Sequence, residues 1–376
     1  MSLSRRQFLA NSTLSAASLP LLGSVTIDYC EASTADSLDW SMGFPQGAVL
    51  LNRNENPIGP SPMAIKAATE GIPKAFRYAD PNAIRVLLAE HYQLARENIL
   101  VGTGSGELLK IAPLAFATEG NIVSTLESFR SVAVHSKRFG ASVKWVNLIK
   151  EKNYAYDIQG MLNAVDNETR ILFAVTPNNP TGLSLSYEEL KTIADGLPRR
   201  VLFIVDEAYI DIDPPKKSGI DLVREGYPNV LVTRTFSKAY ALAGLRCGYG
   251  IGHPDLMKKL SKYGCGPTST NMAGFGAMAA SLADTSHLQR SQNYAKKTRA
   301  LFEKNFRELG IPYLSGPTLF IMGHFGDRVE AINKELRGNK IFVRPGGEWD
   351  LPEHIRVSYG HENEVMAFFN ALRKII

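Results

Sequence analysis

Apolar runs alternate with helical patterns through the middle of the chain. The runs 171–175 and 201–205 contain no polar residue, which is typical of strands buried on both faces of a parallel sheet. From about residue 75 to residue 278, strands of this kind alternate with helical stretches, which predicts a mainly parallel sheet with crossover helices. The pattern therefore favours an α/β fold.

The pattern changes in the last quarter of the chain. A long polar and apolar helix is expected over 289–309, and a last helix over 362–376. Between them, short strands are expected near 319–322, 341–344 and 355–358. We therefore predict a large domain at 75–278 and a smaller α+β domain at 279–376.

Composition narrows the class of protein. The chain has 376 residues, 44% of them hydrophobic and 21% charged, and a net charge of +5, so a globular protein of two domains is expected. No basic cluster accompanies the charge, which argues against nucleic-acid binding and leaves a mild attraction for anionic substrates. Three cysteines without a CxxC pair and seven scattered histidines predict no metal site.

The amino terminus resembles a twin-arginine export signal. Arg5 and Arg6 are followed by Phe-Leu and a mild apolar stretch over 9–22. Polar residues and Pro20 interrupt this stretch, which is short for a membrane span of ~20 residues. We expect a signal and leader over 1–35, no stable membrane anchor and a periplasmic or otherwise exported protein. If the signal does not function, or is only an amphipathic or disordered start, the protein is cytoplasmic.

Lys238 is a candidate Schiff-base lysine. It follows an apolar strand in the run Thr-Phe-Ser-Lys, and Arg246 lies eight residues further on. A lysine amine condenses with an aldehyde only when unprotonated, a form that a desolvated pocket with nearby positive charge favours. Arg246 can supply that charge while its planar fork grips a phosphate. The spacing indicates an aldehyde cofactor with a phosphate tail, although Ser-Lys alone is also typical of a solvated surface.

Polar side chains follow two of the predicted strands. Asp206 comes at the carboxyl end of a strand, where open α/β sheets bind ligands, and can pair with a protonated pyridine nitrogen. Tyr209 and Asn179 can donate hydrogen bonds to an oxygen on the same ring, and two prolines and a glycine stiffen the Asn179 loop. Taken one at a time, each residue also has a structural explanation. Asp206 fits a helix cap or an ion pair, Tyr209 fits a core residue, and Asn179 fits a turn.

A glycine-rich loop opens the apolar helix that begins near residue 108. Glycines let backbone amides approach a phosphate, and the helix N-terminus favours negative charge. The loop lacks the Lys-Ser/Thr ending of a nucleotide-binding P-loop. We predict a phosphate site built from Gly104, Ser105, Gly106, Glu107, Ser237 and Arg246.

Two further residues are candidates for the same site. Phe129 can stack on the cofactor ring, or simply pack in the core. Arg356 lies inside a predicted strand, where its guanidinium can bind a substrate carboxylate bidentately. A half-exposed strand arginine is the alternative for Arg356.

Together these motifs resemble the aspartate aminotransferase superfamily, the class I/II, fold-type-I enzymes that use pyridoxal phosphate, and among them the histidinol-phosphate aminotransferase branch. The resemblance covers roughly 50–375, including the segments 51–60 and 77–81. It implies a seven-stranded sheet and pyridoxal phosphate as cofactor. It also implies that Lys238 forms the Schiff base and moves the α-proton, that Asp206 keeps the ring nitrogen protonated, and that Asn179 and Tyr209 hold the ring oxygen.

The resemblance extends to the substrate and to a partner subunit. It implies a homodimer in which Tyr78 reaches the neighbouring cofactor phosphate. The segment 36–74 is expected to border the active site, with Asn56 binding substrate. Arg344 stands where related enzymes bind the far phosphate of histidinol phosphate, but it can equally hold a carboxylate side chain or lie idle at the surface.

The chain also departs from the pattern of this family. Gly106 stands where an acidic residue is common, and Glu127 where a proline usually precedes the stacking aromatic. These departures put fine geometry and affinity in question rather than the reaction.

The expected reaction moves an amino group between an amino acid or amino-alcohol phosphate and a 2-oxo acid. One alternative is a threonine-phosphate decarboxylase, which shares much of this motif set. The other is a non-catalytic exported binding protein, against which the intact Lys238, Asp206 and Arg356 argue.

Overall fold

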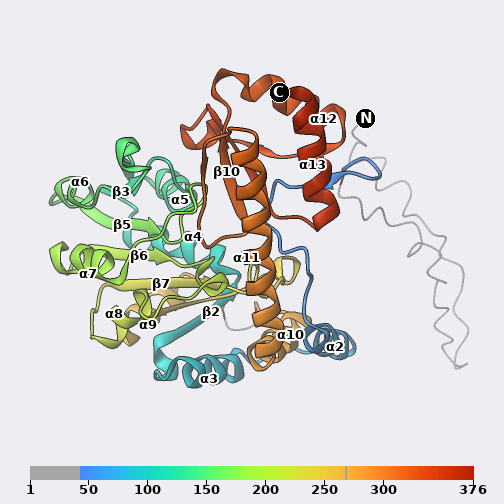
Figure 1. Cartoon of the computed structure of the whole chain (residues 1–376). Helices are drawn as coiled ribbons and strands as arrows, with labels where there is room; N and C mark the ends of the chain where they lie inside the picture. Colours follow the sequence, from blue (N-terminus) through green and yellow to red (C-terminus); the bar gives the residue numbers. More distant parts are fainter. Residues whose placement is uncertain (1–42, 267–268) are drawn as a thin grey trace, which may run out of the picture. The chain divides into compact units, whose positions relative to one another are not determined.

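The computed structural model describes residues 43–266 and 269–376 (Figure 1). A sheet of seven strands in the order β2-β8-β7-β6-β5-β3-β4 lies at its centre. Only β8 runs antiparallel to its neighbours β2 and β7, so the predicted mainly parallel seven-stranded sheet is confirmed. The strands are β2 (Ile99–Thr103), β3 (Asn121–Thr125), β4 (Ser142–Val146), β5 (Thr169–Val175), β6 (Leu202–Asp206), β7 (Val230–Thr235) and β8 (Cys247–Gly252).

Helices cover both faces of this sheet, which explains the unbroken apolar runs. Successive side chains of a strand point to opposite faces, so in β5 Ile171 and Phe173 pack with one set of helices and Leu172 and Ala174 with the other. The first set is α4 (Ser105–Phe116), α5 (Ser131–Phe139) and α9 (Pro254–Ser261). The second set is α6 (Ile158–Asn163), α7 (Tyr187–Gly196) and α8 (Gly219–Arg224).

A second, antiparallel sheet forms the carboxyl-terminal part in the order β12-β13-β10-β9. Its core contains four phenylalanines, Phe302, Phe306, Phe368 and Phe369, whose ring centroids lie 5.0 to 6.5 Å apart. The predicted long helix, short strands and last helix are all present. They are α11 (Thr285–Glu308), β9 (Tyr313–Leu314), β10 (Phe320–His324), α12 (Val329–Gly338), β12 (Arg344–Pro345), β13 (His354–Ser358) and α13 (Glu362–Ile375).

The segment before the large sheet first joins the carboxyl-terminal part. Strand β1 (Val49–Leu50) pairs in parallel with β11 (Ile341–Phe342). Helix α2 (Pro62–Gly71) then packs against α10 (Met272–Ala283), as Figure 1 shows. A Cβ on Gly276 would lie 2.7 Å from the carbonyl oxygen of Ala67, so this close packing requires a glycine.

The remaining elements are short, apart from α3 (Pro81–Tyr92), which packs beside β2. The 3-10 helices are η2 (Ile72–Lys74), η3 (Arg96–Asn98), η4 (Lys150–Lys152), η5 (Ile210–Ile212), η6 (Ala243–Leu245), η7 (Gly326–Arg328) and η8 (Gly346–Trp349).

Residues from Gly47 to Ile376 form one compact unit. The domain boundaries expected after residues 74 and 278 stay predictions. The predicted export signal over 1–35 lies outside the described residues. Within the described part of the chain, no helix has the length and apolar character needed to cross a membrane.

Candidate active site

A cavity of about 470 Å³ lies at the carboxyl ends of β5, β6 and β7, the edge of an α/β sheet where ligands usually bind. Its volume is within the range of small-molecule sites. Residues of α4 and of the second sheet complete its walls. Of the predicted site residues it is lined by Ser105, Gly106, Phe129, Asn179, Asp206, Tyr209, Ser237, Lys238, Arg246, Arg344 and Arg356.

Lys238 reaches into this cavity from the loop after β7. Its Nζ donates to the carbonyl oxygen of Asn54 at 3.0 Å and lies 5.5 Å from the centre of the Tyr209 ring. The loop is fixed from behind by Asn56, whose Nδ2 lies 3.1 Å from the carbonyl oxygens of Lys238 and Ala239. Asn56 therefore holds the backbone of the loop that carries the lysine and does not line the cavity, and its expected contact with substrate stays a prediction.

Asp206 is a buried carboxylate at the end of β6. It is 2% exposed, and Thr233 Oγ1 donates to its Oδ1 at 2.8 Å. Burial raises the pKa of Asp206 to about 6, against the opposing effects of the Thr233 hydrogen bond and the Lys238 charge. A buried acid with this pKa is suited to binding a cation that enters the cavity.

Arg356 presents a guanidinium to the same cavity from β13. Its Nη1 donates to Asn179 Oδ1 and its Nη2 to the carbonyl oxygen of Asn52, both at 2.7 Å. Trp349 packs against it, with the ring centre 4.8 Å away, and in the described part of the chain the Arg356 Nε has no hydrogen-bond partner. Burial lowers the pKa of Arg356 to about 10, so it is still a cation at neutral pH. Among the described residues no carboxylate lies within ion-pair distance of it.

The start of α4, Ser237 and Arg246 lie together in one corner of the cavity and carry groups suited to an anion. Helix α4 begins after Gly104 without a side-chain cap, so its first backbone amides are available to an anion. The corner is tightly packed, because a Cβ on Gly104 would lie 2.7 Å from Arg246 Nη2 and one on Gly248 only 2.2 Å from the Ser105 nitrogen.

Besides Asn56 and Gly104, two more predicted residues do not line the cavity. Glu107 accepts hydrogen bonds at 2.7 Å from the amide and hydroxyl of Thr103 and from the amide of Cys265, so both its carboxylate oxygens are occupied. Burial raises the pKa of Glu107, but these hydrogen bonds outweigh it and leave the pKa below its usual value. Tyr78 is 81% exposed and does not line the cavity of its own chain.

The loop that carries Phe129 is anchored at its base. Glu127, the departure from the family pattern, accepts a hydrogen bond from the Leu148 amide at 2.9 Å, and its own carbonyl oxygen accepts one from Asn178 Nδ2 at 3.0 Å. Burial raises the pKa of Glu127. The Oδ1 of Asn178 also accepts a hydrogen bond from Ser128 Oγ at 2.6 Å. These hydrogen bonds join the loop that carries Phe129 to the loop that carries Asn179.

Several cavity residues were not named as candidate site residues, although Asn54 lies in the segment 36–74 that was expected to border the active site. Asn54 has a φ of 55°, and its Nδ2 donates to Tyr209 Oη at 2.9 Å, while its backbone amide donates to Ser358 Oγ at 2.8 Å. The asparagine-rich run before Pro57 was a signal for it, since asparagine tolerates positive φ. Glu348 and Trp349 also line the cavity, and no periodic pattern marks their 3-10 turn.

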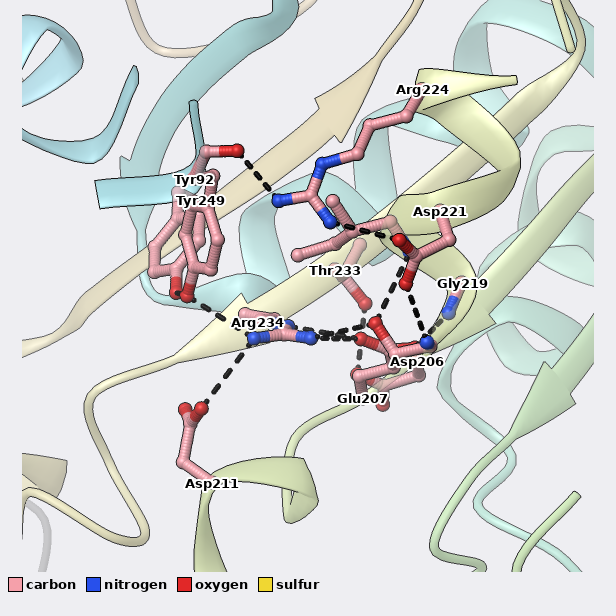
Figure 2. Close-up of polar contacts among 12 residues, drawn as sticks. Tyr92, Asp206, Glu207, Asp211, Gly219, Asp221, Arg224, Thr233, Arg234 and Tyr249 are labelled. Carbon is pink, nitrogen blue, oxygen red and sulfur yellow. Dashed lines mark hydrogen bonds and ion pairs between the residues drawn. The ribbon is translucent and has the colours of Figure 1, made fainter. Parts of the chain in front are cut away.

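Directly behind the site, a buried ion-pair network joins β6 to β7 (Figure 2). Arg234 donates to Glu207 Oε2 from Nε at 2.9 Å and from Nη2 at 2.7 Å, and to Tyr92 Oη at 3.2 Å. Arg234 shares the face of β7 with Val232, whereas Thr233 and Asp206 point to the α4 face. This network therefore fixes the ends of the two strands without entering the cavity.

The fold and this cavity define the class of protein. The model of the Aminotransferase class I and II family matches residues 46–372, so the chain belongs to this family and is a transaminase. In the regions that the structure describes, no group of three or more His, Cys, Asp or Glu side chains is placed to hold a metal ion.

Individual relatives support this assignment. The chain is 34% identical over 342 residues to histidinol-phosphate aminotransferase 2 of Pseudomonas fluorescens, covering 88% of this chain and 90% of that protein. It is 33% identical over 351 residues to the enzyme of the same name from Nitrosospira multiformis, covering 92% and 88%. The crystal structure of histidinol-phosphate aminotransferase from Sinorhizobium meliloti in complex with pyridoxal 5'-phosphate superposes with a TM-score of 0.81 at 27% identity, covering 87% and 90%.

Proposed function

We propose that this aminotransferase moves an amino group between an amino acid or an amino-alcohol phosphate of the histidinol phosphate kind and a 2-oxo acid. Its cofactor is pyridoxal phosphate. The observation that carries the proposal is that Lys238, Asp206 and Arg356, from three distant segments, face one cavity. The names of the relatives support the same substrate class.

The residues present fit this cofactor. The uncapped start of α4, with Ser237 and Arg246, is suited to the phosphate. Asp206 would keep the ring nitrogen of the cofactor protonated, because a carboxylate close to a base favours the charged form of that base. Asn179 and Tyr209 would hold the ring oxygen, and Phe129 would lie against the ring face. When bound, the cofactor supplies an electron sink for the substrate α-carbon.

The chain's own groups then have distinct tasks. Lys238 would hold the aldehyde of the cofactor through its amine, and the same amine would move the proton of the substrate α-carbon. Asn54 and Arg53 supply carbonyl oxygens that hold its Nζ, at 3.0 and 3.4 Å. Arg356 binds the anionic group of the substrate and so orients the α-carbon toward the lysine.

The central test compares Lys238→Ala with Lys258→Ala, an exposed lysine on α9. With pyridoxal phosphate supplied, Lys238→Ala should lose turnover and the borohydride-trappable adduct, and Lys258→Ala should keep both. A panel of amino donors, followed by conversion to the pyridoxamine form, would identify the substrate. Turnover retained in Lys238→Ala would refute the role of this lysine, and carbon dioxide release without need of a 2-oxo acid would refute transamination.

We also propose a homodimer in which Tyr78 completes the partner's phosphate site. The support is that Tyr78 and Phe76 are 81% and 78% exposed, which is unusual for aromatic side chains of a lone subunit. Mixing inactive Tyr78→Ala and Lys238→Ala chains should restore part of the activity, because one site of each mixed dimer then has both residues. No restoration in a mixture that forms mixed dimers would contradict the sharing.

Export by the twin-arginine route is a separate proposal. Arg5 and Arg6 before Phe-Leu support it. Arg5→Lys combined with Arg6→Lys should retain the protein in the cytoplasm of a host that has this export route. Equal export of both forms would contradict it.

A further inference from the structure

Two arginines lie side by side in the cavity. Arg344 of β12 and Arg356 of β13 are directly opposite each other in the antiparallel register, so their side chains leave the same face of the second sheet. Both line the cavity. Two guanidinium groups in this arrangement would be suited to a substrate with two separate anionic groups.

The two arginines differ in their partners: Arg344 pairs with a carboxylate, and Arg356 has no carboxylate partner among the residues that the structure describes. Arg344 is bound by Glu348, with Nε donating to Oε1 at 3.0 Å and Nη2 donating to Oε2. Glu348 itself lines the cavity. Arg356, in contrast, is bound by an amide oxygen and a carbonyl oxygen, so its charge is available to a substrate anion.

The turn that carries Glu348 fixes the backbone at this residue, while its side chain and that of Arg344 stay 41% and 47% exposed. In η8, a Cβ on Gly346 would lie 2.3 Å from the carbonyl oxygen of Leu351, so the turn is tightly closed. Trp349, which follows Glu348 in this turn, is 4% exposed and packs against Arg356. The same turn therefore places Trp349 against Arg356 and Glu348 against Arg344.

We propose that Glu348 selects substrates with a single anionic group by occupying Arg344. This inference rests on the proposed function and specifies its substrate class. A second anionic group would have to displace the Glu348 carboxylate from a two-point contact and would then lie beside a like charge. Amines with one phosphate or one carboxylate, and 2-oxo acids with an uncharged side chain, do not meet this obstacle.

The test measures binding rather than turnover. Calorimetric titration of the pyridoxal-phosphate-loaded enzyme compares glutarate, with two carboxylates, and pentanoate, with one. Glu348→Gln should raise the affinity for glutarate relative to pentanoate roughly tenfold, because a freed arginine gains one charge-assisted contact. In the double variant Arg344→Gln, Glu348→Gln this gain should disappear. Glu353→Gln serves as a control, because Glu353 contacts His324 and Lys150 outside this cavity.

An unchanged ratio in Glu348→Gln would overturn the proposal. So would an equal rise in Glu353→Gln, or a rise that persists without Arg344, because either result would indicate a general charge effect. These outcomes are independent of catalysis. A wild-type enzyme that transaminates no donor would refute the proposed function, whereas the two-ligand comparison would still decide the role of Glu348.

Discussion

The burial of Asp206 has a cost that should be measurable when the cofactor is absent. Its pKa is raised to about 6 in the folded protein from the ordinary value of 3.8. Because the folded state binds this proton more tightly than the unfolded state, the stabilisation is fully present below pH 3.8 and is lost as the pH rises through about 6. The difference between the two values corresponds to about 3 kcal/mol.

Asp206→Asn removes the titration and keeps an oxygen that can accept from Thr233. For the unit from Gly47 to Ile376, an unfolding entropy of about 2.1 cal/mol/K per residue converts about 3 kcal/mol to about 4 °C in the thermal midpoint. Scanning calorimetry of the cofactor-free proteins between about pH 4 and pH 7 should therefore show the midpoint of Asp206→Asn rising relative to wild type by up to this amount.

Adding pyridoxal phosphate should reverse the order of the thermal midpoints of wild type and Asp206→Asn. At neutral pH the wild-type carboxylate would gain the ring nitrogen as a partner, and the uncharged amide of the Asp206→Asn variant would not. If the midpoints of the cofactor-free proteins stay parallel across the whole pH range, the account of Asp206 as a strained buried acid is wrong.

Three further predictions concern the scaffold around the site. Arg234→Met should destabilise the protein by about 3–5 kcal/mol, because Glu207 becomes an unpaired buried charge, and calorimetry should show part of this recovered in the double variant with Glu207→Leu. No recovery would argue against the pairing. Gly248→Ala should weaken cofactor binding by about tenfold or more, or ~1.4 kcal/mol, since its Cβ would meet the Ser105 amide at 2.2 Å. A fluorescence titration with unchanged affinity would contradict this. Asn54→Ala should cost roughly 1–3 kcal/mol through backbone strain and lost hydrogen bonds, and Asn54→Gly should cost less, as denaturation midpoints would reveal.

Much of the site could be predicted because its residues follow recognisable strands. Asp206 and Asn179 come directly after apolar runs, and the carboxyl ends of neighbouring parallel strands meet at one edge of a sheet. Lys238 and Arg246 belong to the next turn along the same edge. For these residues, position in the chain was enough to indicate position in the fold.

The remaining residues depend on contacts between distant segments, which local patterns do not report. Whether Asn56 faces a substrate or the main chain of Lys238 is decided by packing across 182 residues of sequence. Glu107 looked suitable for the phosphate corner because it opens α4, but the loop at Cys265 occupies its carboxylate. Glu348 lies in a short turn whose course is set by Trp349 and Arg356 rather than by any repeating pattern.

The placement of Arg234 and Asp206 on opposite faces of neighbouring strands has an evolutionary consequence. The Arg234–Glu207 ion pair holds the strand ends, and Asp206 faces the ligand; the two features share a backbone but no side-chain atoms. Substitutions in the cavity wall can therefore accumulate without breaking the ion pair. A gene duplicate of this chain could acquire a new amine preference and inherit its rigidity unchanged.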